Sequence, residues 1–424
     1  MIFKFILLVI ALLGAPLFII IATGAIAGFT QEDTDLAVIP IEIYRLAETP
    51  ILIAIPLFTF AGYLLGESKA PSRLVNFTNA LFGWLPGGLA IMALVTCAIF
   101  TAFTGASGVT IVALGALLFP ALKQAGYSER FNLGLITSSG SLGVLLAPSL
   151  PLILYGVVVQ QLGSEQAVSI DDLFLAGLLP GLLMIVMLSV WSMMQKRQPI
   201  QQKQTVDRSA VLNALRESVW ELPLPFVVLG GIYSGYFAVS EAAAITALYV
   251  FIVEVFILKE INIRNLPRIM RESMVMVGGI LIILGVSLAL TNYMIDTEVP
   301  QHLFDTIKTH VDSKYTFLIL LNIFLLILGL MLDIFSALVI IVPIIFPIAM
   351  SYGINPVHLG IIFLANMQIG YFTPPVGMNL FIASYRFNRP VMELYRATIP
   401  FFFILLLSVL IITYWPGLSL FLLD

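Results

Sequence analysis

Charged residues are scarce in this sequence. Only 10% of its 424 residues are Asp, Glu, Lys or Arg, less than half the usual fraction of a soluble domain, while 60% are hydrophobic. No soluble fold could bury so much apolar surface. Cysteine is limited to Cys97, which excludes an internal disulfide, and a net charge of −4 without a basic cluster excludes nucleic acid as the expected partner.

Long apolar runs dominate what is present. Stretches of about 20 residues recur along the chain, each long enough to cross a hydrocarbon layer of roughly 30 Å as a helix. A β-barrel would show short alternating segments instead. The first run, residues 2–29, is too long for a signal peptide and is followed by further apolar runs, so we interpret it as a membrane helix. The sequence therefore predicts an all-α polytopic protein with membrane lipid as its surroundings.

The distribution of Lys and Arg predicts the topology. These residues gather in five segments, residues 67–82, 123–130, 196–216, 259–271 and 386–396, which the positive-inside rule places in the cytoplasm. Acidic or mixed loops at residues 31–48, 160–172 and 296–314 would then face outside. The same assignment places the N-terminus in the cytoplasm and the C-terminus outside.

Two apolar segments must enter the membrane and return to the face they came from. Residues 84–122 lie between two cytoplasmic segments and have a polar, glycine-rich interruption at residues 104–110. Residues 315–350, interrupted at residues 332–336, begin and end outside by the same parity. We interpret both as re-entrant hairpins that enter from opposite faces.

The hairpins and the helices after them form an internal repeat. At a shift of about 227 positions, and with a one-residue slip, two glycines and two prolines of the first half fall on the same residue types in the second: Pro120 on Pro347, Gly126 on Gly353, Gly143 on Gly370 and Pro148 on Pro375. In each copy a helix broken by glycine and proline follows the hairpin, at residues 138–151 and 368–377. Opposite orientation of the copies predicts an inverted-topology repeat, which is typical of secondary transporters.

These boundaries divide the chain into six parts. Scaffold helices occupy residues 1–83, and the core of the first repeat occupies residues 84–158, with its hairpin at 84–122 and its broken helix at 132–158. A scaffold helix and a cytoplasmic amphipathic linker follow at residues 159–221, and the scaffold helices of the second repeat at 222–314. The second core occupies residues 315–384, with its hairpin at 315–350 and its broken helix at 357–384, and a C-terminal helix covers residues 385–424.

Broken helices in lipid need a reason, because each unpaired backbone group costs several kcal/mol there. Bound ions and solute can supply the missing partners, since half-helix N-termini attract anions and exposed carbonyls bind Na⁺. The alternative is that glycine and proline only kink helices for packing. Four breaks in two matching pairs favour binding. Each hairpin tip, facing its broken helix, is then a candidate cation site.

The candidate Na⁺ ligands lie at the tips and breaks. They are Gly105, Ser107, Ser139 and Gly143 in the first repeat, and Asp333, Ser336, Gly370, Thr373 and Gly377 in the second. Hydroxyls and carbonyls suit a hard cation. Asp333 is far from either interface and has no basic neighbour in sequence, so a functional role is the default interpretation. The alternative is an aspartate that caps the second arm of the hairpin, and both roles can coexist.

Three polar residues beside the breaks are candidates for contacting the solute: Ser141, Tyr155 and Asn379. Each could equally satisfy a neighbouring helix. Elsewhere, Glu241 is explained by capping of a helix start, and Glu254 is expected to reach the cytoplasmic interface near Lys259. Residues 208–221 are expected to form an amphipathic helix on the cytoplasmic surface, with Val211, Leu212, Leu215 and Val219 on its apolar face.

Several stretches resemble the large membrane subunit of tripartite ATP-independent periplasmic (TRAP) transporters. They are residues 55–62 (IPLFTFAG), 105–108 (GASG), 147–156 (APSLPLILYG), 231–235 (GIYSG), 240–244 (SEAAA) and 370–380 (GYFTPPVGMNL), so the match runs nearly from end to end. The resemblance implies a bacterial inner-membrane protein paired with a small four-helix membrane subunit and a soluble periplasmic substrate-binding protein. It also implies Na⁺ symport of a small organic anion by an elevator-like movement of a transport domain against a scaffold.

The sequence departs from the family pattern at two positions. Many members have an aspartate after the first hairpin tip, where Thr110 stands here, and Pro-Pro in the first broken helix, where Ala147 replaces the first proline. The substrate contacts of sialic acid or dicarboxylate members are therefore not carried over.

Two other functions were weighed against this one. The Gly-Ala-Ser-Gly string also resembles the nucleophile signature of rhomboid intramembrane proteases, but that chemistry needs a membrane histidine. His302 and His310 fall in an outside loop and His358 opens a helix near the surface, so we expect no enzyme and no organic cofactor. No Walker-type loop for ATP is present. A one-component elevator-type anion/Na⁺ symporter remains the alternative transporter.

Overall fold

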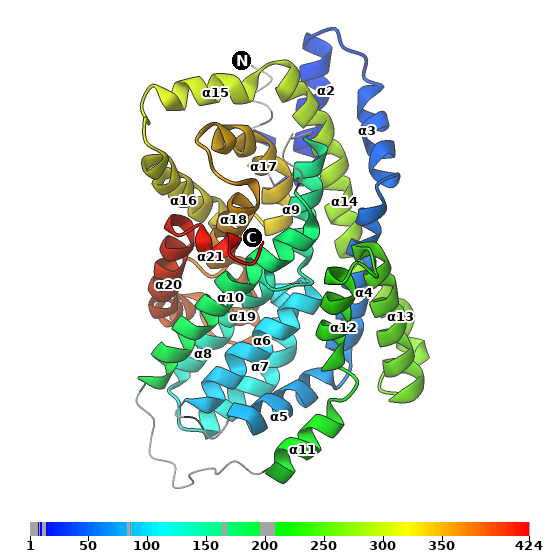
Figure 1. Ribbon diagram of the computed structural model, residues 1–424, viewed down its shortest axis with the longest axis vertical. Coiled ribbons are helices and arrows are strands. Elements are labelled where there is room, and N and C mark those ends of the chain that lie inside the picture. The colour runs from blue at the N-terminus through cyan, green and yellow to red at the C-terminus, as the bar shows by residue number, and fades with distance from the viewer. Residues whose placement is uncertain are drawn as a thin grey trace.

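The computed structural model describes residues 14–82, 85, 87–162, 168–195 and 208–423, together with residues 7, 9 and 10. Every regular element in this part of the chain is a helix (Figure 1). Within it, eight helices are long and apolar enough to cross a membrane, or nine if a pair bent by 42° counts as one span. Of the predicted first helix, residues 2–6, 8 and 11–13 lie outside the described residues, and α2 covers residues 17–29. A single helix over residues 2–29 is wrong, because Gly14, with a φ of +86°, and Pro16 precede the start of α2.

The first half of the chain runs through α2 (Leu17–Gln31), α3 (Val38–Ala47), η1 (Pro50–Ile53), α4 (Ala54–Glu67), α5 (Ala70–Phe82), α6 (Gly88–Thr104), α7 (Ser107–Gln124), α8 (Glu129–Ser139), η2 (Leu142–Leu145), α9 (Leu150–Gln161) and α10 (Ile170–Met193). The second half runs through α11 (Arg208–Glu217), α12 (Pro223–Tyr233), α13 (Val239–Phe251), η3 (Ile252–Ile257), η4 (Ile263–Asn265), α14 (Leu266–Asp296), α15 (Val299–Lys308), α16 (Lys314–Met331), α17 (Ile334–Ser351), α18 (Pro356–Gly370), α19 (Met378–Phe387), α20 (Val391–Tyr414) and α21 (Gly417–Leu420).

The two halves repeat the same order of helices. At an offset of 227 residues, the bounds of α7 fall on those of α17, and α6 falls on α16 to within one residue. The same offset places α5 on α15 and the pair α8 and α9 on α18 and α19 to within a few residues, while α10 overlaps α20 with a shift of six residues. The break between α8 and α9 contains the cis peptide bond Ala147–Pro148, and the break between α18 and α19 contains the cis peptide bond Pro374–Pro375. The helix order therefore supports the repeat far beyond the four aligned residues.

The breaks at the hairpin tips are shorter than the sequence suggested. Only Gly105 and Ala106 separate α6 from α7, and only Leu332 and Asp333 separate α16 from α17. The predicted interruptions at residues 104–110 and 332–336 were too wide because small and polar residues at a helix start, such as Ser107 and Ser336, are compatible with the first turn.

Three segments predicted as loops contain helices, which corrects the sequence interpretation. Residues 31–48 include α3, which leads through η1 into α4, while residues 67–82 and 296–314 include α5 and α15. Charged and polar residues made these segments look irregular. In the structure all three are helical, and some of the charged residues point inward: Glu42 of α3 is only 7% exposed, and the side chain of Arg73 in α5 is only 12% exposed.

The loops contact one another in two separate groups. Loops rich in Lys and Arg meet one another, through Arg268 with Glu67 and through Arg389 with Glu129. Predicted outside segments also meet, because Arg45 donates to Gln161 at 2.9 Å. At the second hairpin, Lys314 Nζ donates to the carbonyl of Gly353 at 2.8 Å, so both ends of that hairpin lie on one face. The grouping matches the parity derived from the charges.

The helices form two packed groups joined by short connectors. One group contains α2, α3, α4, α13 and α14, which lie along one side of the molecule in Figure 1. The other contains α6 to α10 with α16 to α21, which pack on one another. The amphipathic helices α5 and α15 connect the groups and lie at opposite ends of the molecule in this view. They are equivalent elements of the repeat.

Candidate functional site: two hairpin tips at helix breaks

The first hairpin tip lies against the break between α8 and α9. Gly105 ends α6 with a φ of +64°, a conformation that a residue with a side chain rarely adopts. A Cβ there would also lie 2.4 Å from Leu150 Cδ1, at the start of α9. The first half-helix, α8, ends at Ser139, and the carbonyl of Gly140 follows it. The tip and the break therefore share one small volume, at the middle of a bent pair whose combined length spans a membrane.

Threonine side chains line the first tip. Thr101 Oγ1 donates to the carbonyl of Gly140 at 2.9 Å and lies 2.7 Å from Thr110 Oγ1. Thr104 Oγ1 is buried and has no hydrogen-bond partner. Sequence reasoning missed Thr101 and Thr104, because threonine in an apolar helix is common and most such hydroxyls bond to their own backbone. The tip thus carries one unsatisfied oxygen of the kind that a hard cation binds.

Ser107 and Asn379 link the two repeats. Ser107 Oγ, at the first residue of α7, donates to Asn379 Oδ1 at 2.7 Å. Asn379 lies one residue after the start of α19, and its Nδ2 donates to the carbonyl of Thr137 at 3.3 Å. The sequence assigned Ser107 to a cation site and Asn379 to the solute. The structure brings these two side chains together in one buried contact.

Asp333 at the second tip acts as the N-cap of α17. Its Oδ1 accepts from the backbone N–H groups of Phe335 and Ser336, each at 3.0 Å, and its Oδ2 accepts from Ser336 Oγ. The hydroxyl of Tyr371, in the break after α18, accepts from the N–H of Ile334 at 2.8 Å. The cap thus holds Asp333 and Ser336 at the tip and the break beside them, and each carboxylate oxygen keeps lone pairs that a cation could use.

Each broken helix packs on the first arm of its own hairpin without room for a side chain. A Cβ on Gly370 would lie 2.4 Å from Gly329 Cα on α16, and one on Gly143 would lie 2.2 Å from the carbonyl oxygen of Ala98 on α6. Gly143 and Gly370 are equivalent in the repeat. Their role in the structure is close backbone packing, which brings the break next to the tip.

The two breaks also touch each other. Ser141 Oγ donates to the carbonyl of Gln368 at 3.1 Å, and these residues are separated by 227 positions, the offset of the repeat. Equivalent residues that contact each other lie on the approximate two-fold axis between the copies. Gln368 is fully buried, and its Oε1 has no hydrogen-bond partner. Ser141 therefore lies at the contact between the two copies.

The remaining candidates bond within their own helices or to a neighbour. Ser139 Oγ donates to the carbonyl of Ile136 and Thr373 Oγ1 to that of Ile369. A Cβ on Gly377 would lie 2.7 Å from the carbonyl oxygen of Tyr371. The hydroxyl of Tyr155 donates to the carbonyl of Pro356 at 2.6 Å, at the opposite end of α18 from its break. This contact supports the alternative that Tyr155 satisfies a neighbouring helix.

His358 is buried rather than at the surface, which corrects the sequence interpretation. Its ring nitrogens lie 3.1 Å from Ser419 Oγ and 3.3 Å from the carbonyl of Thr413, because α20 and α21 cover the start of α18. These contacts are at the far end of α18 from the tips, so His358 is not paired with Ser107. Among the described residues, no group of three His, Cys, Asp or Glu side chains could hold a metal ion.

An apolar cavity of about 170 Å³ lies beside the first break. Its lining includes Ala102 and Phe103 of α6, Ala147 in the break, Phe174 of α10 and Leu229 of α12. It therefore lies where the hairpin group meets α12. Its walls are almost entirely apolar, and Tyr233 is the one lining residue with a polar side-chain atom.

Paired hairpins, broken helices and an inverted repeat together define the membrane-spanning part of a secondary transporter. Comparison with known families gives the particular group. Residues 2–418 match the model described as tripartite ATP-independent periplasmic transporter, DctM component, and the chain belongs to this family. It is a large permease subunit and a multi-pass protein of the bacterial inner membrane.

Individual relatives extend this result. The chain is 33% identical to the C4-dicarboxylate TRAP transporter large permease protein DctM of Pseudomonas aeruginosa, over 94% of this chain and 92% of that protein. It is also 33% identical to the isethionate TRAP transporter permease protein DctMQ of Oleidesulfovibrio alaskensis, covering 96% of this chain and 64% of that longer protein. The YdaH transporter of Alcanivorax borkumensis shares the fold, with a TM-score of 0.60 at 14% identity over 88% of this chain and 89% of that one.

Proposed function

We propose that this permease couples the entry of Na⁺ to the uptake of a small organic anion, which a soluble periplasmic binding protein delivers. The observation that carries the proposal is the contact between the first hairpin tip and the second broken helix, through Ser107 and Asn379. One side chain belongs to a candidate cation site and the other to the candidate solute site. Binding at one would therefore change the geometry at the other.

The cation would bind at the two tips. Hydroxyl and carbonyl oxygens are the ligands that Na⁺ prefers, and both tips gather them at helix ends. In the first repeat these are Ser107 and the backbone at Gly105, Ser139 and Gly143. In the second they are Asp333, Ser336 and Thr373 with the backbone at Gly370 and Gly377. Thr104, with its unpartnered buried hydroxyl, joins the first set.

The solute would lie between the two breaks, near Ser141 and Asn379. The half-helices α9 and α19 begin there, and helix N-termini favour an anion. Two relatives are named for anions, C4-dicarboxylates and isethionate, while two others are named for ectoine, a zwitterion that also carries a carboxylate. Tyr155 stays in the proposal only as a distant contact, since its hydroxyl already has a partner.

The movement proposed is an elevator-like shift of the hairpin group against the group around α4, α13 and α14. The connectors α5 and α15 join the groups by short links and could accommodate such a shift. With the positive loops in the cytoplasm, the N-terminus lies inside and the C-terminus outside. A small four-helix membrane subunit is the expected partner, and the fused name DctMQ of one relative is consistent with a second membrane component.

Reconstitution in vesicles tests the proposal. The permease, its small membrane subunit and its binding protein should together take up the solute only when an inward Na⁺ gradient is present. Omission of either partner should abolish uptake. The alternative, a one-component symporter, predicts robust uptake of the free anion by this chain alone, and that result would replace the three-component proposal.

A further inference from the structure

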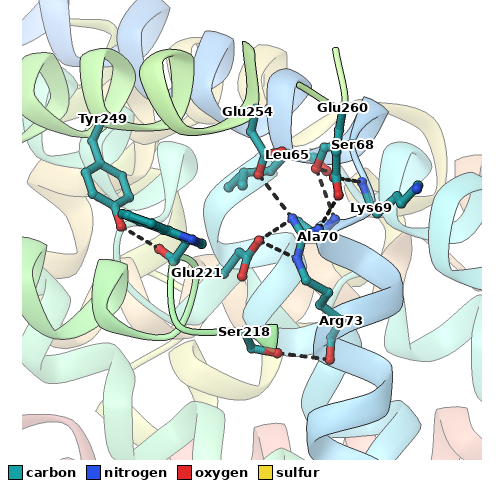
Figure 2. Close-up of polar contacts among 11 residues, drawn as sticks. Leu65, Ser68, Lys69, Ala70, Arg73, Ser218, Glu221, Tyr249, Glu254 and Glu260 are labelled. Atoms are coloured by element: carbon teal, nitrogen blue, oxygen red, sulfur yellow. Dashed lines mark hydrogen bonds and ion pairs between the residues drawn. The ribbon is translucent and has the colours of Figure 1, made fainter. Parts of the chain in front are cut away.

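A buried charge cluster lies on the connector α5, away from the hairpin tips. Arg73 of α5 meets three glutamates from two other parts of the chain: Glu221 in the turn after α11, Glu254 in η3 and Glu260 in the loop that follows (Figure 2). We call these four residues the Arg73 cluster. Sequence reasoning expected Glu254 at the interface near Lys259, but its side chain is only 1% exposed because α5 covers it.

The three glutamates are held to different degrees. Arg73 donates twice to Glu221 Oε1, through Nε at 2.7 Å and through Nη2, and once to Glu260 Oε1 at 2.5 Å. Glu260 Oε2 also accepts from the backbone N–H of Lys69. Glu254 Oε1 is 3.5 Å from Arg73 Nη2, the longest of these contacts. Glu254 is therefore the most buried and the most weakly paired of the three.

The charges of the cluster do not balance. One guanidinium faces three carboxyl groups, which leaves two negative charges in excess if all are ionised. Among the residues that the structure describes, no further cation pairs with these carboxyl groups. Figure 2 shows the side chain of Lys69 directed away, and Lys259 and Arg216 are exposed. Arg268 is engaged by Glu67 and Glu272, and Tyr249, the remaining titratable neighbour, donates to the carbonyl of Trp220.

Two carboxylate oxygens in the cluster also lack a partner. Glu221 Oε2 and Glu254 Oε2 are buried without a hydrogen bond, and their side chains are 5% and 1% exposed. An ionised oxygen left unpaired at such depth is costly, whereas a protonated one is neutral. Burial raises the pKa of Glu221 in spite of Arg73. Burial alone would lower the pKa of Arg73, but the hydrogen bonds that Arg73 donates to Glu221 and Glu260 outweigh it and raise that pKa. The guanidinium therefore stays charged, so the excess negative charge is reduced by protonation of one of the carboxyl groups.

We propose that the Arg73 cluster binds one proton, carried by the carboxyl group of Glu254, and that this proton helps to hold α5 against η3 and the turn at residues 218–221. Glu254 lies in a π-helical segment, Ile252–Ile257, a rare form of helix that occurs mostly at functional sites. Ser218 Oγ adds a hydrogen bond to the carbonyl of Arg73 at 3.2 Å. Loss of the proton would weaken the attachment of the connector.

Only one of the two equivalent connectors is held in this way. The helix α15 is equivalent to α5 in the repeat. Its one buried residue is Pro300, which occupies the position equivalent to Arg73 of α5. The proton site would thus act on one connector alone and make its attachment depend on pH. The proposal is independent of Na⁺ coupling at the tips.

Thermal unfolding of the purified protein at a series of pH values tests the proposal. A folded state that holds one extra proton is stabilised at low pH and loses that stability as the pH rises. Because the unfolded carboxyl group ionises above about pH 4.3, the melting temperature of the wild-type protein should fall by about 2 °C or more between about pH 5 and pH 8. In Glu254→Gln, which is neutral at every pH and similar in shape, this slope should flatten. Glu272→Gln, a half-exposed glutamate paired with Arg268, should keep the wild-type slope.

The infrared spectrum supplies a second readout that needs no variant. The wild-type protein should show the C=O stretching band of a protonated carboxyl group at neutral pH, and Glu254→Gln should lack it. A wild-type spectrum without that band would overturn the proposal, even if the variant failed to fold. A Glu254→Gln protein whose melting temperature falls with pH as steeply as the wild type would do the same.

Discussion

Ser107 illustrates how one hydroxyl can serve a helix, a tip and a contact between repeats. It begins α7, it lies at the first tip, and it donates to Asn379 of the second repeat. Serine at a helix start is ordinary, so the sequence indicated the tip but not the partner. The partner lies 272 positions away, and only the folding of both repeats together brings it near.

Removal of this hydroxyl should have a measurable cost. Ser107→Ala leaves Asn379 Oδ1 buried and unpaired, so we expect a loss of about 1–3 kcal/mol in stability. A double-mutant cycle with Asn379→Ala should give a coupling energy of at least about 0.5 kcal/mol, measured by thermal unfolding in detergent. Strictly additive losses would mean that the two side chains do not interact. Ser351→Ala, on an exposed hydroxyl, should change little.

Gly370 tests the close packing of a break on its hairpin. Gly370→Ala would place a Cβ 2.4 Å from Gly329 Cα, so backbone would have to move. We expect a destabilisation of about 1–3 kcal/mol and loss of transport. Gly278→Ala is the matched control, because nothing lies within 4 Å of its added Cβ and alanine favours a helix. If Gly370→Ala and Gly278→Ala were equally stable in unfolding experiments, Gly370 would not pack closely on Gly329.

At the scale of elements, the hairpins decide the topology. Both ends of the first hairpin should face the cytoplasm, because the loops beside them carry its charge signature. Cysteines placed at Lys69 and Lys123, both exposed, should react with an impermeant reagent from the inside only. The native Cys97 is buried and should contribute little background. Labelling of the two positions from opposite faces would eliminate the first hairpin.

Hydrophobic length and charge parity were enough to predict both hairpins, because these depend on composition over many residues. The two broken helices followed from the glycines and prolines that recur in the repeat. The helices α3, α5 and α15 were missed, since their charged residues look like those of a loop until the helical face is known. Single contacts were harder still. Glu254 was assigned to an interface from its neighbour Lys259, but its partner Arg73 lies 181 positions away. Thr104 stands next to the Gly-Ala-Ser-Gly run and could have been selected from the sequence, whereas Thr101 lies within an apolar run that gives no signal.

At the scale of the molecule, the repeat gives two similar tips with different chemistry. The first has neutral hydroxyls and an unpartnered Thr104, while the second has the carboxylate of Asp333. The cap explains the position of Asp333, and the proposed Na⁺ site explains why a charge stands there. A substitution by asparagine can separate these two roles, because asparagine replaces aspartate well as a cap but does not neutralise a cation.

The half-saturating Na⁺ concentration of uptake in Asp333→Asn therefore tests the coupling most directly. It should be measured in vesicles that contain the permease with both partners. If Asp333 offsets the charge of a bound Na⁺, the value should rise about tenfold, equivalent to about 1.4 kcal/mol of cation binding. Ser107→Ala, which removes one neutral ligand, should raise it less. A half-saturating Na⁺ concentration equal to that of the wild type in Asp333→Asn would contradict the assignment of the second tip to Na⁺.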